Sequence, residues 1–343
     1  MKLDFNDILI EPAQVSDIYS RKLIDPFYPG GAFPLITAPM DTVVSSDNAN
    51  VFSNNRINVC LPRGEKSSRS HMVYQLTKDY PMVFESYGIG EFLQKFLGKV
   101  DQPGRYILID VANGHMEDVL DATRLAKKRY GDSMCLMVGN VANPKTYVSL
   151  SEAGADYIRV GIGNGGGCLT TEQTGVGYPM ASLIYDCYQE SLKLKNSAKI
   201  VADGGMQKYS DIIKALALGA DYVMVGSIFN KAIESSGPTY WKGIQVHENI
   251  ALWLYRHNFK LTKKFRGMST KEVQNKWGNS VLKTSEGVIR FRPVEYTLNQ
   301  WVNNFEHYLR SAMSYSNALT LKDFIGKAKT NIISQAAYKR FNK

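Results

Sequence analysis

The chain has no long hydrophobic run, and it has few cysteines for its 343 residues. No stretch approaches the roughly 20 apolar residues that span a membrane, and the N-terminus shows no apolar core of a signal peptide. The four cysteines, Cys60, Cys135, Cys168 and Cys187, show no C-x-x-C pairing. We therefore expect a reduced, cytoplasmic protein that does not bind a membrane.

Acidic residues are outnumbered, with 32 Asp and Glu against 41 Lys and Arg and a net charge of +9. The basic residues are scattered along the chain and not gathered into one stripe, so we expect no nucleic-acid partner. An anionic small-molecule substrate fits the same charge, and charge alone does not choose between these partners. The sequence also lacks internal repeats, low-complexity tracts and a clear linker.

Eight short, mostly continuous hydrophobic segments are typical of strands buried on both faces. They are Pro34–Met40, Ile57–Arg63, Met82–Gly88, Tyr106–Gly114, Cys135–Val141, Ala155–Gly163, Lys199–Gly205 and Ala220–Ser227. Helical spacing occurs between them, in Ser45–Asn54, Ser67–Lys78, Ile89–Leu97, Met116–Tyr130, Pro144–Glu152, Met180–Leu194 and Lys208–Leu218. This alternation predicts an α/β fold, a closed (β/α)8 TIM barrel that forms one domain over residues 1–343.

Residues 228–300 interrupt this alternation after the eighth strand. A turn at Glu234–Pro238 precedes Trp241–Phe259, whose spacing is compatible with a helix, and a basic, glycine-punctuated stretch follows at Lys263–Glu272. We interpret 228–300 as a lid that folds over the rim of the barrel, because long irregular insertions in compact domains are usually functional or disordered. Leu298–Met313 and Leu321–Ala328 are expected to be helical and to close the barrel.

Polar residues stand at the ends of several predicted strands, among them Asp110, Asn140 and Asp203. In a barrel the C-terminal strand ends share one face, and that face carries the chemistry. Each residue taken singly fits the role of a helix N-cap. Convergence of all of them on one rim favours a functional site.

The loop from Arg159 to Pro179 contains five glycines in seven residues, at 161–167, and these lead to Cys168 and Thr170. Glycine lets the backbone approach a ligand closely, so this loop can surround an anion or a cation with its own N–H and C=O groups. A flexible surface turn is the alternative. We expect Cys168 to be a nucleophile whose pKa is depressed by the surrounding N–H groups, and the other cysteines to be inert packing residues.

With these features the sequence resembles the IMP dehydrogenase/GMP reductase family over essentially its whole length. The cysteine loop, Val160-Gly161-Ile162-Gly163-x-Gly165-x-x-Cys168-x-Thr170, matches the family signature. Four further motifs match in order: Ala38-Pro39-Met40-Asp41-Thr42-Val43, Gly139-Asn140-Val141, Asp203-Gly204-Gly205 and Gly267-Met268-Ser269.

Other features resemble the reductase branch: Asp110–His115, Thr174–Pro179 and Ser285-Glu286-Gly287. No regulatory domain fits between the second and third strands, and Lys276-Trp277 departs from the water-activating Arg-Tyr pair of the dehydrogenases. The alternatives are an IMP dehydrogenase without the regulatory insert, a related activity on another purine (deoxy)nucleotide, and a non-catalytic nucleotide-binding relative.

The resemblance implies NADPH-dependent reductive deamination of GMP to IMP and ammonia, through a thioimidate on Cys168, by a homotetramer. Thr170 and Glu272 would handle the proton of the leaving ammonia. The implied nucleotide-binding residues are Asp203, Gly204, Gly205, Gly226, Ser227, Gly267, Met268, Ser269, Ser285, Glu286 and Gly287. The implied cofactor-binding residues are Ser20, Arg21, Arg63, Asp110, Val111, Ala112 and Lys283. Carbonyl groups of Gly163, Gly165 and Cys168 would form a potassium site.

Four positions depart from the family pattern. Asn164 and Gly166 stand where the family usually has Pro and Ser, and the loss of the serine removes a hydroxyl from the phosphate site. Arg63 replaces a lysine of the reductases. The reductases' lid glutamate falls at Lys271, with Glu272 one position later.

Overall fold

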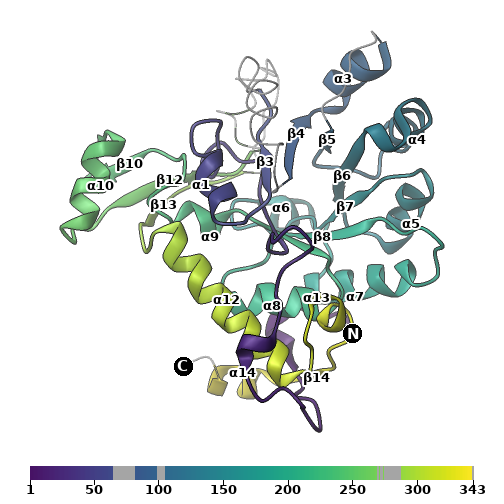
Figure 1. The fold of residues 1–343 in the computed structure, drawn as a ribbon. Coiled ribbons are helices and arrows are strands. Elements are labelled where there is room, and N and C mark those ends of the chain that lie inside the picture. Colours follow the sequence, from purple (N-terminus) through teal and green to yellow (C-terminus); the bar gives the residue numbers. More distant parts are fainter. Residues whose placement is uncertain (65–81, 99–104, 269, 271–272, 274–286, 342–343) are drawn as a thin grey trace.

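Eight short parallel strands form the centre of the structure, a computed structural model that describes residues 1–64, 82–98, 105–268, 270, 273 and 287–341 (Figure 1). They are β2 (Leu35–Thr37), β3 (Val59–Leu61), β4 (Val83–Tyr87), β5 (Tyr106–Asp110), β6 (Cys135–Val141), β7 (Tyr157–Val160), β8 (Lys199–Asp203) and β9 (Tyr222–Val225). Their order is β2-β9-β8-β7-β6-β5-β4-β3. A parallel bridge from Ile36 to Asn58 joins the two edges, and the Thr37 N–H donates to the Asn58 carbonyl at 2.9 Å. The predicted (β/α)8 barrel is confirmed.

Both faces of these strands are buried, which explains their continuous hydrophobic sequences. One set of side chains fills the barrel interior: Ile36, Cys60, Phe84, Leu108, Met137, Val201, Tyr222 and Met224. Alternate residues of the same strands, such as Val83 and Ile107, belong to a second core beneath the surrounding helices. The barrel is therefore packed through its centre, and the cavity described below lies at its mouth.

Helices follow the strands as expected. They are α1 (Ala49–Asn54), α3 (Ile89–Phe92, continued by η3, Leu93–Gly98), α4 (Glu117–Tyr130), α5 (Pro144–Glu152), α6 (Thr170–Thr174), α7 (Met180–Ser191), α8 (Tyr209–Ala217) and α9 (Ser227–Asn230). α4 buries Val119, Ala122, Thr123 and Ala126, the i, i+3, i+4, i+7 face of an amphipathic helix. The helix expected over 67–78 lies outside the described residues.

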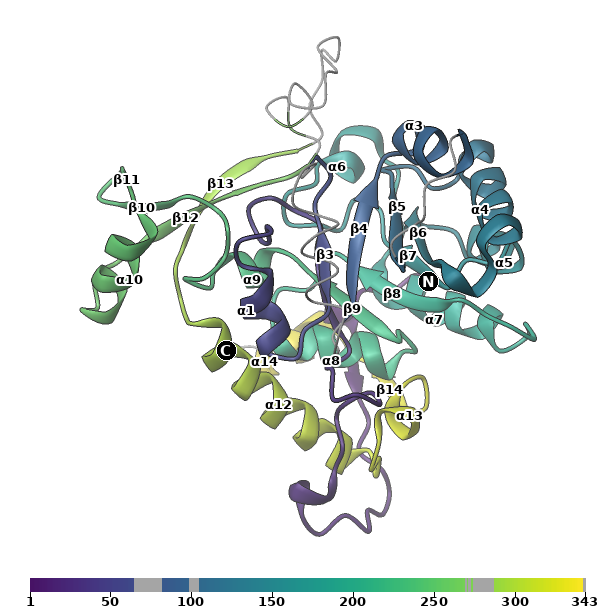
Figure 2. The ribbon, with the colours of Figure 1, turned by 45° about the horizontal axis from the view of Figure 1, so that its top comes forward.

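The segment after α9 forms a four-stranded antiparallel sheet, ordered β11-β10-β12-β13, with one helix. Its elements are β10 (Thr239–Trp241), β11 (Ile244–Val246), α10 (Glu248–Arg256), β12 (Thr262–Arg266) and β13 (Ile289–Pro293). β10, β11 and α10 project sideways from the barrel, whereas the inner ends of β12 and β13 lie near its mouth (Figure 2). The range that the sequence analysis interprets as a lid, 228–300, therefore includes both an outward part and a part near the mouth of the barrel.

The prediction of a helix over Trp241–Phe259 is wrong at its start. Trp241 pairs with Ile244 across a two-residue turn, in which Lys242 and Gly243 have φ of 49° and 83°. Positive φ at both turn positions is the geometry of a type I′ hairpin, and a residue-glycine pair favours it. The helix therefore begins only at Glu248. Of the basic stretch that follows, residues 263–266 belong to the strand β12, whereas residues 269, 271 and 272 lie outside the described residues.

The last part of the chain packs on the outside of the barrel. On α12 (Leu298–Tyr315), the Trp301 ring packs edge-to-face against Phe229 of α9, with ring centroids 5.2 Å apart. This helix completes the outer layer as expected. The next helix, α13, is shorter than predicted and ends at Phe324.

The two ends of the chain meet. β1 (Ile8–Ile10) pairs with β14 (Thr330–Ile332) in a small antiparallel sheet, followed by α14 (Gln335–Phe341). Within the described ranges, no helix is both long and apolar enough to cross a bilayer.

Replacement of Phe84 by alanine tests the packed interior. Phe84 is fully buried, and its ring lies 5.3 Å from that of Tyr106 and 5.5 Å from that of Tyr157. We expect Phe84→Ala to lower the free energy of unfolding by about 3–5 kcal/mol, because a cavity remains between these rings. Phe341→Ala, at a side chain that is 66% exposed, is the control and should change it by less than about 0.5 kcal/mol. Urea denaturation measures both, and similar values would contradict the filled-barrel description.

Candidate active site

A cavity of about 250 Å³ lies at the mouth of the barrel. Its wall is formed by residues at the C-terminal ends of strands and by the cysteine loop, and it includes the predicted polar residues Asp110, Asn140 and Asp203. Fifteen of the site residues predicted from the sequence line it: Arg63, Asp110, Val111, Ala112, Gly163, Gly165, Cys168, Thr170, Asp203, Gly204, Gly205, Gly226, Ser227, Gly267 and Met268. The strand ends thus converge on one rim.

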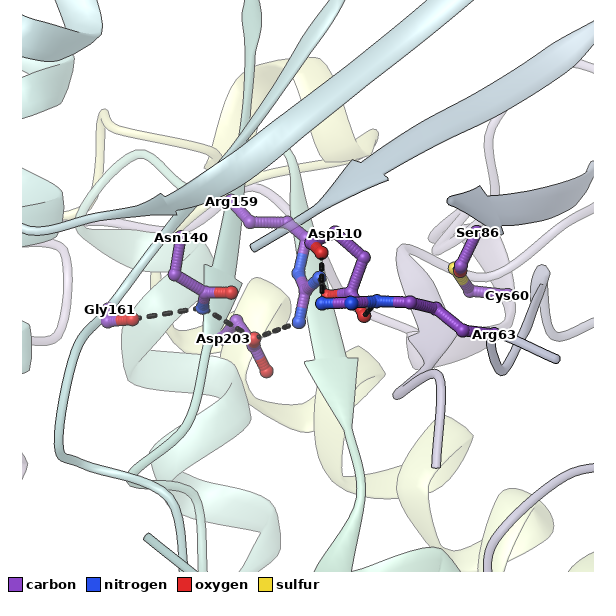
Figure 3. A network of polar contacts seen from close by, with 8 residues as sticks. All are labelled: Cys60, Arg63, Ser86, Asp110, Asn140, Arg159, Gly161 and Asp203. Atoms are coloured by element: carbon purple, nitrogen blue, oxygen red, sulfur yellow. Dashed lines mark hydrogen bonds and ion pairs between the residues drawn. The ribbon is translucent and has the colours of Figure 1, made fainter. Parts of the chain in front are cut away.

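Arg159 of β7 joins two carboxylates on the floor of this cavity (Figure 3). Its Nη1 donates to Asp110 Oδ1 at 2.6 Å, and its Nη2 donates to Asp203 Oδ2 at 2.8 Å. The guanidinium group is almost completely buried, with 7% of the side chain exposed. A single buried cation therefore fixes acidic side chains that come from β5 and β8.

The ion pairs keep these groups charged. Burial acts to raise the pKa of Asp110, but the nearby charges and hydrogen bonds of Arg159 and Arg63 outweigh it, and the pKa lies below its ordinary value. Burial acts to lower the pKa of Arg159, but Asp203 and Asp110 outweigh it, and the pKa is raised. The side chain of Asp110 is therefore deprotonated near neutral pH.

Two further residues extend this network. Arg63 donates from Nε to Asp110 Oδ2 at 3.0 Å and from Nη2 to the Asp110 carbonyl. Asn140 donates from Nδ2 to Asp203 Oδ2 at 2.7 Å and to the Gly161 carbonyl at 2.9 Å. Asn140 and Arg159 both donate to Oδ2 of Asp203, and its Oδ1 accepts no hydrogen bond from the described part of the chain. Oδ1 is therefore available to a ligand in the cavity.

The cysteine loop connects β7 to α6 at the edge of the cavity. The Cys168 N–H donates to the Gly165 carbonyl at 3.0 Å, which closes a turn before the cysteine. Cys168 is partly exposed, and its Sγ lies 3.2 Å from Thr170 Oγ1, to which it donates. A thiol and a hydroxyl thus stand side by side at the wall of the cavity.

The residues next to the inner ends of β12 and β13 contact this loop backbone to backbone. The Val288 N–H donates to the Gly167 carbonyl at 3.1 Å, and Cys168 forms an antiparallel bridge with Gly287. A Cβ on Gly267 would lie 2.3 Å from the Gly167 oxygen, so only glycine fits at this contact. Gly267 and Met268 therefore line the cavity, and Gly287 lies beside Cys168.

Some predicted residues are not at the cavity or are not described. Ser20 caps the short helix η2 (Arg21–Leu23), which contacts α12, and neither Ser20 nor Arg21 lines the cavity. Lys283 and four further predicted residues, Ser269, Glu272, Ser285 and Glu286, lie outside the described residues.

The sequence analysis assigned no role to Arg159. The available signal was an arginine inside a hydrophobic strand, since arginine is almost never fully buried unless it is paired. Its partners come from strands that are about 40–50 residues away in the chain, and only the barrel closure brings them together. Phe265 and Met40, which also line the cavity, were likewise not singled out.

The other three cysteines are packing residues, as expected from their places in strands and a helix. Burial raises the pKa of Cys60 and Cys135 to about 12, and it also raises the pKa of Cys187. Cys60 Sγ lies 3.5 Å from Ser86 Oγ inside the barrel. None of the three lines the cavity. In the described part of the chain, no group of three or more His, Cys, Asp or Glu side chains is arranged to hold a metal ion.

Comparisons with known proteins match most of the chain to one family. The model described as "IMP dehydrogenase / GMP reductase domain" matches residues 99–342. GMP reductase 2 of Mus musculus is 30% identical, over 94% of this chain and 92% of the relative. GMP reductase 1 of Homo sapiens is 28% identical, over 96% and 94% of the two chains. GMP reductase of Shewanella pealeana is 28% identical, over 94% and 92%.

Selective alkylation tests the difference between the cysteines. Iodoacetamide at pH 8 should modify Cys168 at least about tenfold faster than Cys60 or Cys187, because those two thiols are buried and their pKa values are raised. Mass spectrometry of peptides taken over time measures the four rates. Faster modification of Cys60 or Cys187 would show that the barrel core opens before the cavity thiol reacts.

Proposed function

Since this chain belongs to the IMP dehydrogenase/GMP reductase family, we propose that it is an NADPH-dependent GMP reductase, which converts GMP to IMP and ammonia. The observation that carries the proposal is the position of Cys168, which lines the cavity beside Thr170. Full-length similarity to curated GMP reductases supports the reductive reaction over the alternatives.

In the proposed reaction, the sulfur of Cys168 bonds to purine C2, and the exocyclic amino group leaves as ammonia. Thr170 lies 3.2 Å from that sulfur and would pass a proton to the leaving nitrogen. We assign the partner role in this proton transfer to Glu272. NADPH, when bound, supplies the hydride that C2 needs. Cleavage of the C–S bond then returns Cys168 and releases IMP, so the net change replaces an amino group by hydrogen and oxidises NADPH to NADP⁺.

The nucleotide would be held by three parts of the cavity. Asp203 would accept from the ribose hydroxyls, and its Oδ2 is already held by Arg159 and Asn140. The 5′-phosphate would accept from backbone N–H groups of residues that follow β8 and β9, namely Gly204, Gly205, Gly226 and Ser227. The lid would contact the purine edge through residues that include Gly267, Met268 and Gly287, and also Ser269, Ser285 and Glu286.

The cofactor would lie on the side of the cavity that Asp110, Val111, Ala112 and Arg63 form. These residues fit such a role, because a charged arginine and backbone groups suit a phosphate-bearing dinucleotide. We further assign Ser20, Arg21 and Lys283 to cofactor binding, and we expect a cytoplasmic homotetramer.

Potassium completes the proposal. Carbonyl oxygens, here those of Gly163, Gly165 and Cys168, are the hard donors that such cations take. The Gly165 carbonyl also accepts the Cys168 N–H, so an ion there would stabilise the same turn that positions the thiol.

Replacement of Cys168 tests the reaction. Cys168→Ala should lower the GMP-dependent oxidation of NADPH by several orders of magnitude, because it removes the proposed nucleophile and none of the other three cysteines lines the cavity. GMP affinity should remain nearly unchanged, and Cys135→Ala, at a thiol outside the cavity, should remain active. Absorbance of the reduced cofactor measures the rate. Substantial activity of Cys168→Ala would contradict the mechanism, and rapid XMP formation from IMP and NAD⁺ by the wild-type protein would identify a dehydrogenase.

Replacement of Asp203 tests the ribose contact. Asp203→Ala should weaken GMP binding at least about tenfold, because a hydrogen bond to a charged group contributes roughly 1.5–3 kcal/mol. The loss should be much smaller for 2′-deoxy-GMP, which lacks one of the two hydroxyls. Calorimetric titration gives both dissociation constants. Equal losses would mean that Asp203 acts through Arg159 and the network, not on the ribose.

A further inference from the structure

Arg292 lies over the backbone of Gly166 in the cysteine loop. A Cβ on Gly166 would be 3.0 Å from Arg292 Nη2 and 3.6 Å from both Cβ and Oγ of Ser227. Gly166 and Ser227 both line the cavity. The guanidinium group therefore occupies the space that a side chain at position 166 would take, at the corner where the cysteine loop meets the end of β9.

This guanidinium group is partly buried, and no ion pair joins it to a carboxylate among the residues that the structure describes. Glu295, the acid that acts on it electrostatically, pairs instead with Lys231 at 2.8 Å. The Arg292 Nε is buried and has no hydrogen-bond partner in the same part of the chain. The Cζ of Arg292 lies 4.7 Å from the centroid of the Phe265 ring, which is a cation–π contact.

Its neighbours in the sheet are also cations. Lys263 stands directly opposite Arg292 in the register of β12 and β13, and Arg290 stands opposite Phe265. Burial and the charge of Arg290 both lower the pKa of Arg292. Like charges directly opposite each other destabilise a sheet, and an unpaired buried charge destabilises it further. An anion bound beside Arg292 would offset both the repulsion between the cations and the burial of an unpaired charge.

We propose that Arg292 binds the 5′-phosphate of the nucleotide, with its guanidinium group in the space above Gly166 and beside Ser227. A guanidinium group presents paired N–H donors whose geometry matches two oxygens of a phosphate. This inference rests on the proposed function, because it requires a purine nucleoside monophosphate in the cavity. It makes Arg292 a binding residue that acts in addition to the backbone groups.

The inference also gives Gly166 a specific role. A side chain at position 166 would displace the guanidinium group, because its Cβ alone comes within 3.0 Å of Nη2. Gly166 and Arg292 should therefore act as one unit. Their substitutions should be non-additive, as expected for residues in contact.

Calorimetric titration with GMP and with guanosine separates the phosphate from the rest of the ligand. We expect Arg292→Ala to weaken GMP binding by about 10- to 100-fold, the range for loss of a charge-assisted hydrogen bond, and to leave guanosine binding unchanged. The GMP affinity of Arg292→Lys should lie between those of the wild-type protein and Arg292→Ala. Arg290→Ala removes the same charge from an exposed position on the same strand and should change GMP binding less than about threefold. An unchanged GMP affinity of Arg292→Ala, or an equal loss with guanosine, would overturn the inference.

A double-mutant cycle tests the assignment to the space above Gly166. Gly166→Ala should weaken GMP binding in the wild-type protein and have no further effect in Arg292→Ala. Additive losses of affinity would overturn this assignment.

Titration of IMP and AMP beside their nucleosides separates this inference from the proposed function. A wild-type protein that binds monophosphates more tightly than nucleosides but does not reduce GMP would refute only the activity. A protein without that preference would refute the inference.

Discussion

The candidate site depends on one buried cation. Arg159 projects from β7 and pairs at once with Asp203 of the neighbouring strand β8 and with Asp110 of β5, which lies beyond β6. Removal of one partner from a buried ion pair typically costs about 3–5 kcal/mol, because a charge is left unpaired. Neither acidic side chain is therefore free to turn away, and the orientation of both in the cavity is a consequence of Arg159. Arg63 and Asn140 extend this constraint to β3 and β6.

The cysteine loop is also tied to the residues next to β12 and β13 by backbone hydrogen bonds. The chain passes from β12 through Gly267, whose N–H donates to the Val288 carbonyl at 3.0 Å, while the Val288 N–H donates to the Gly167 carbonyl. A displacement of the inner ends of β12 and β13 would move the backbone next to Cys168. The outward part of the sheet has its own small core, around Leu254 and Leu261. The backbone at Cys168 is thus held from two sides, by the barrel through β7 and by the bridge to Gly287.

The barrel was predictable because each of its strands is buried on both faces and is followed by a segment of helical period. All eight strands lie within the ranges expected from the sequence. The hairpin at Lys242-Gly243 was missed because hydrophobic residues on both sides of it fit a helical period equally well. The pairing of β1 with β14 was missed for another reason: three-residue strands about 320 residues apart carry no local signal. In the site, the glycine and acidic residues were predictable, but the ion pairs of Arg159 depend on closure of the barrel, and the position of Arg292 over Gly166 depends on strand register.

The register of β12 and β13 also shows where some of the basic residues lie. The net charge of +9 suits either a nucleic acid or a small anion, and it does not choose between them. In β12 and β13, however, pairing places Lys263 opposite Arg292 and directs Arg292 to the glycines of the cavity. Lys263 is also buried, and burial lowers its pKa to about 8 while its Nζ donates to the Ser235 carbonyl. Under the proposal for Arg292, one of these partly buried charges thus has a small anion as its partner at the mouth of the barrel.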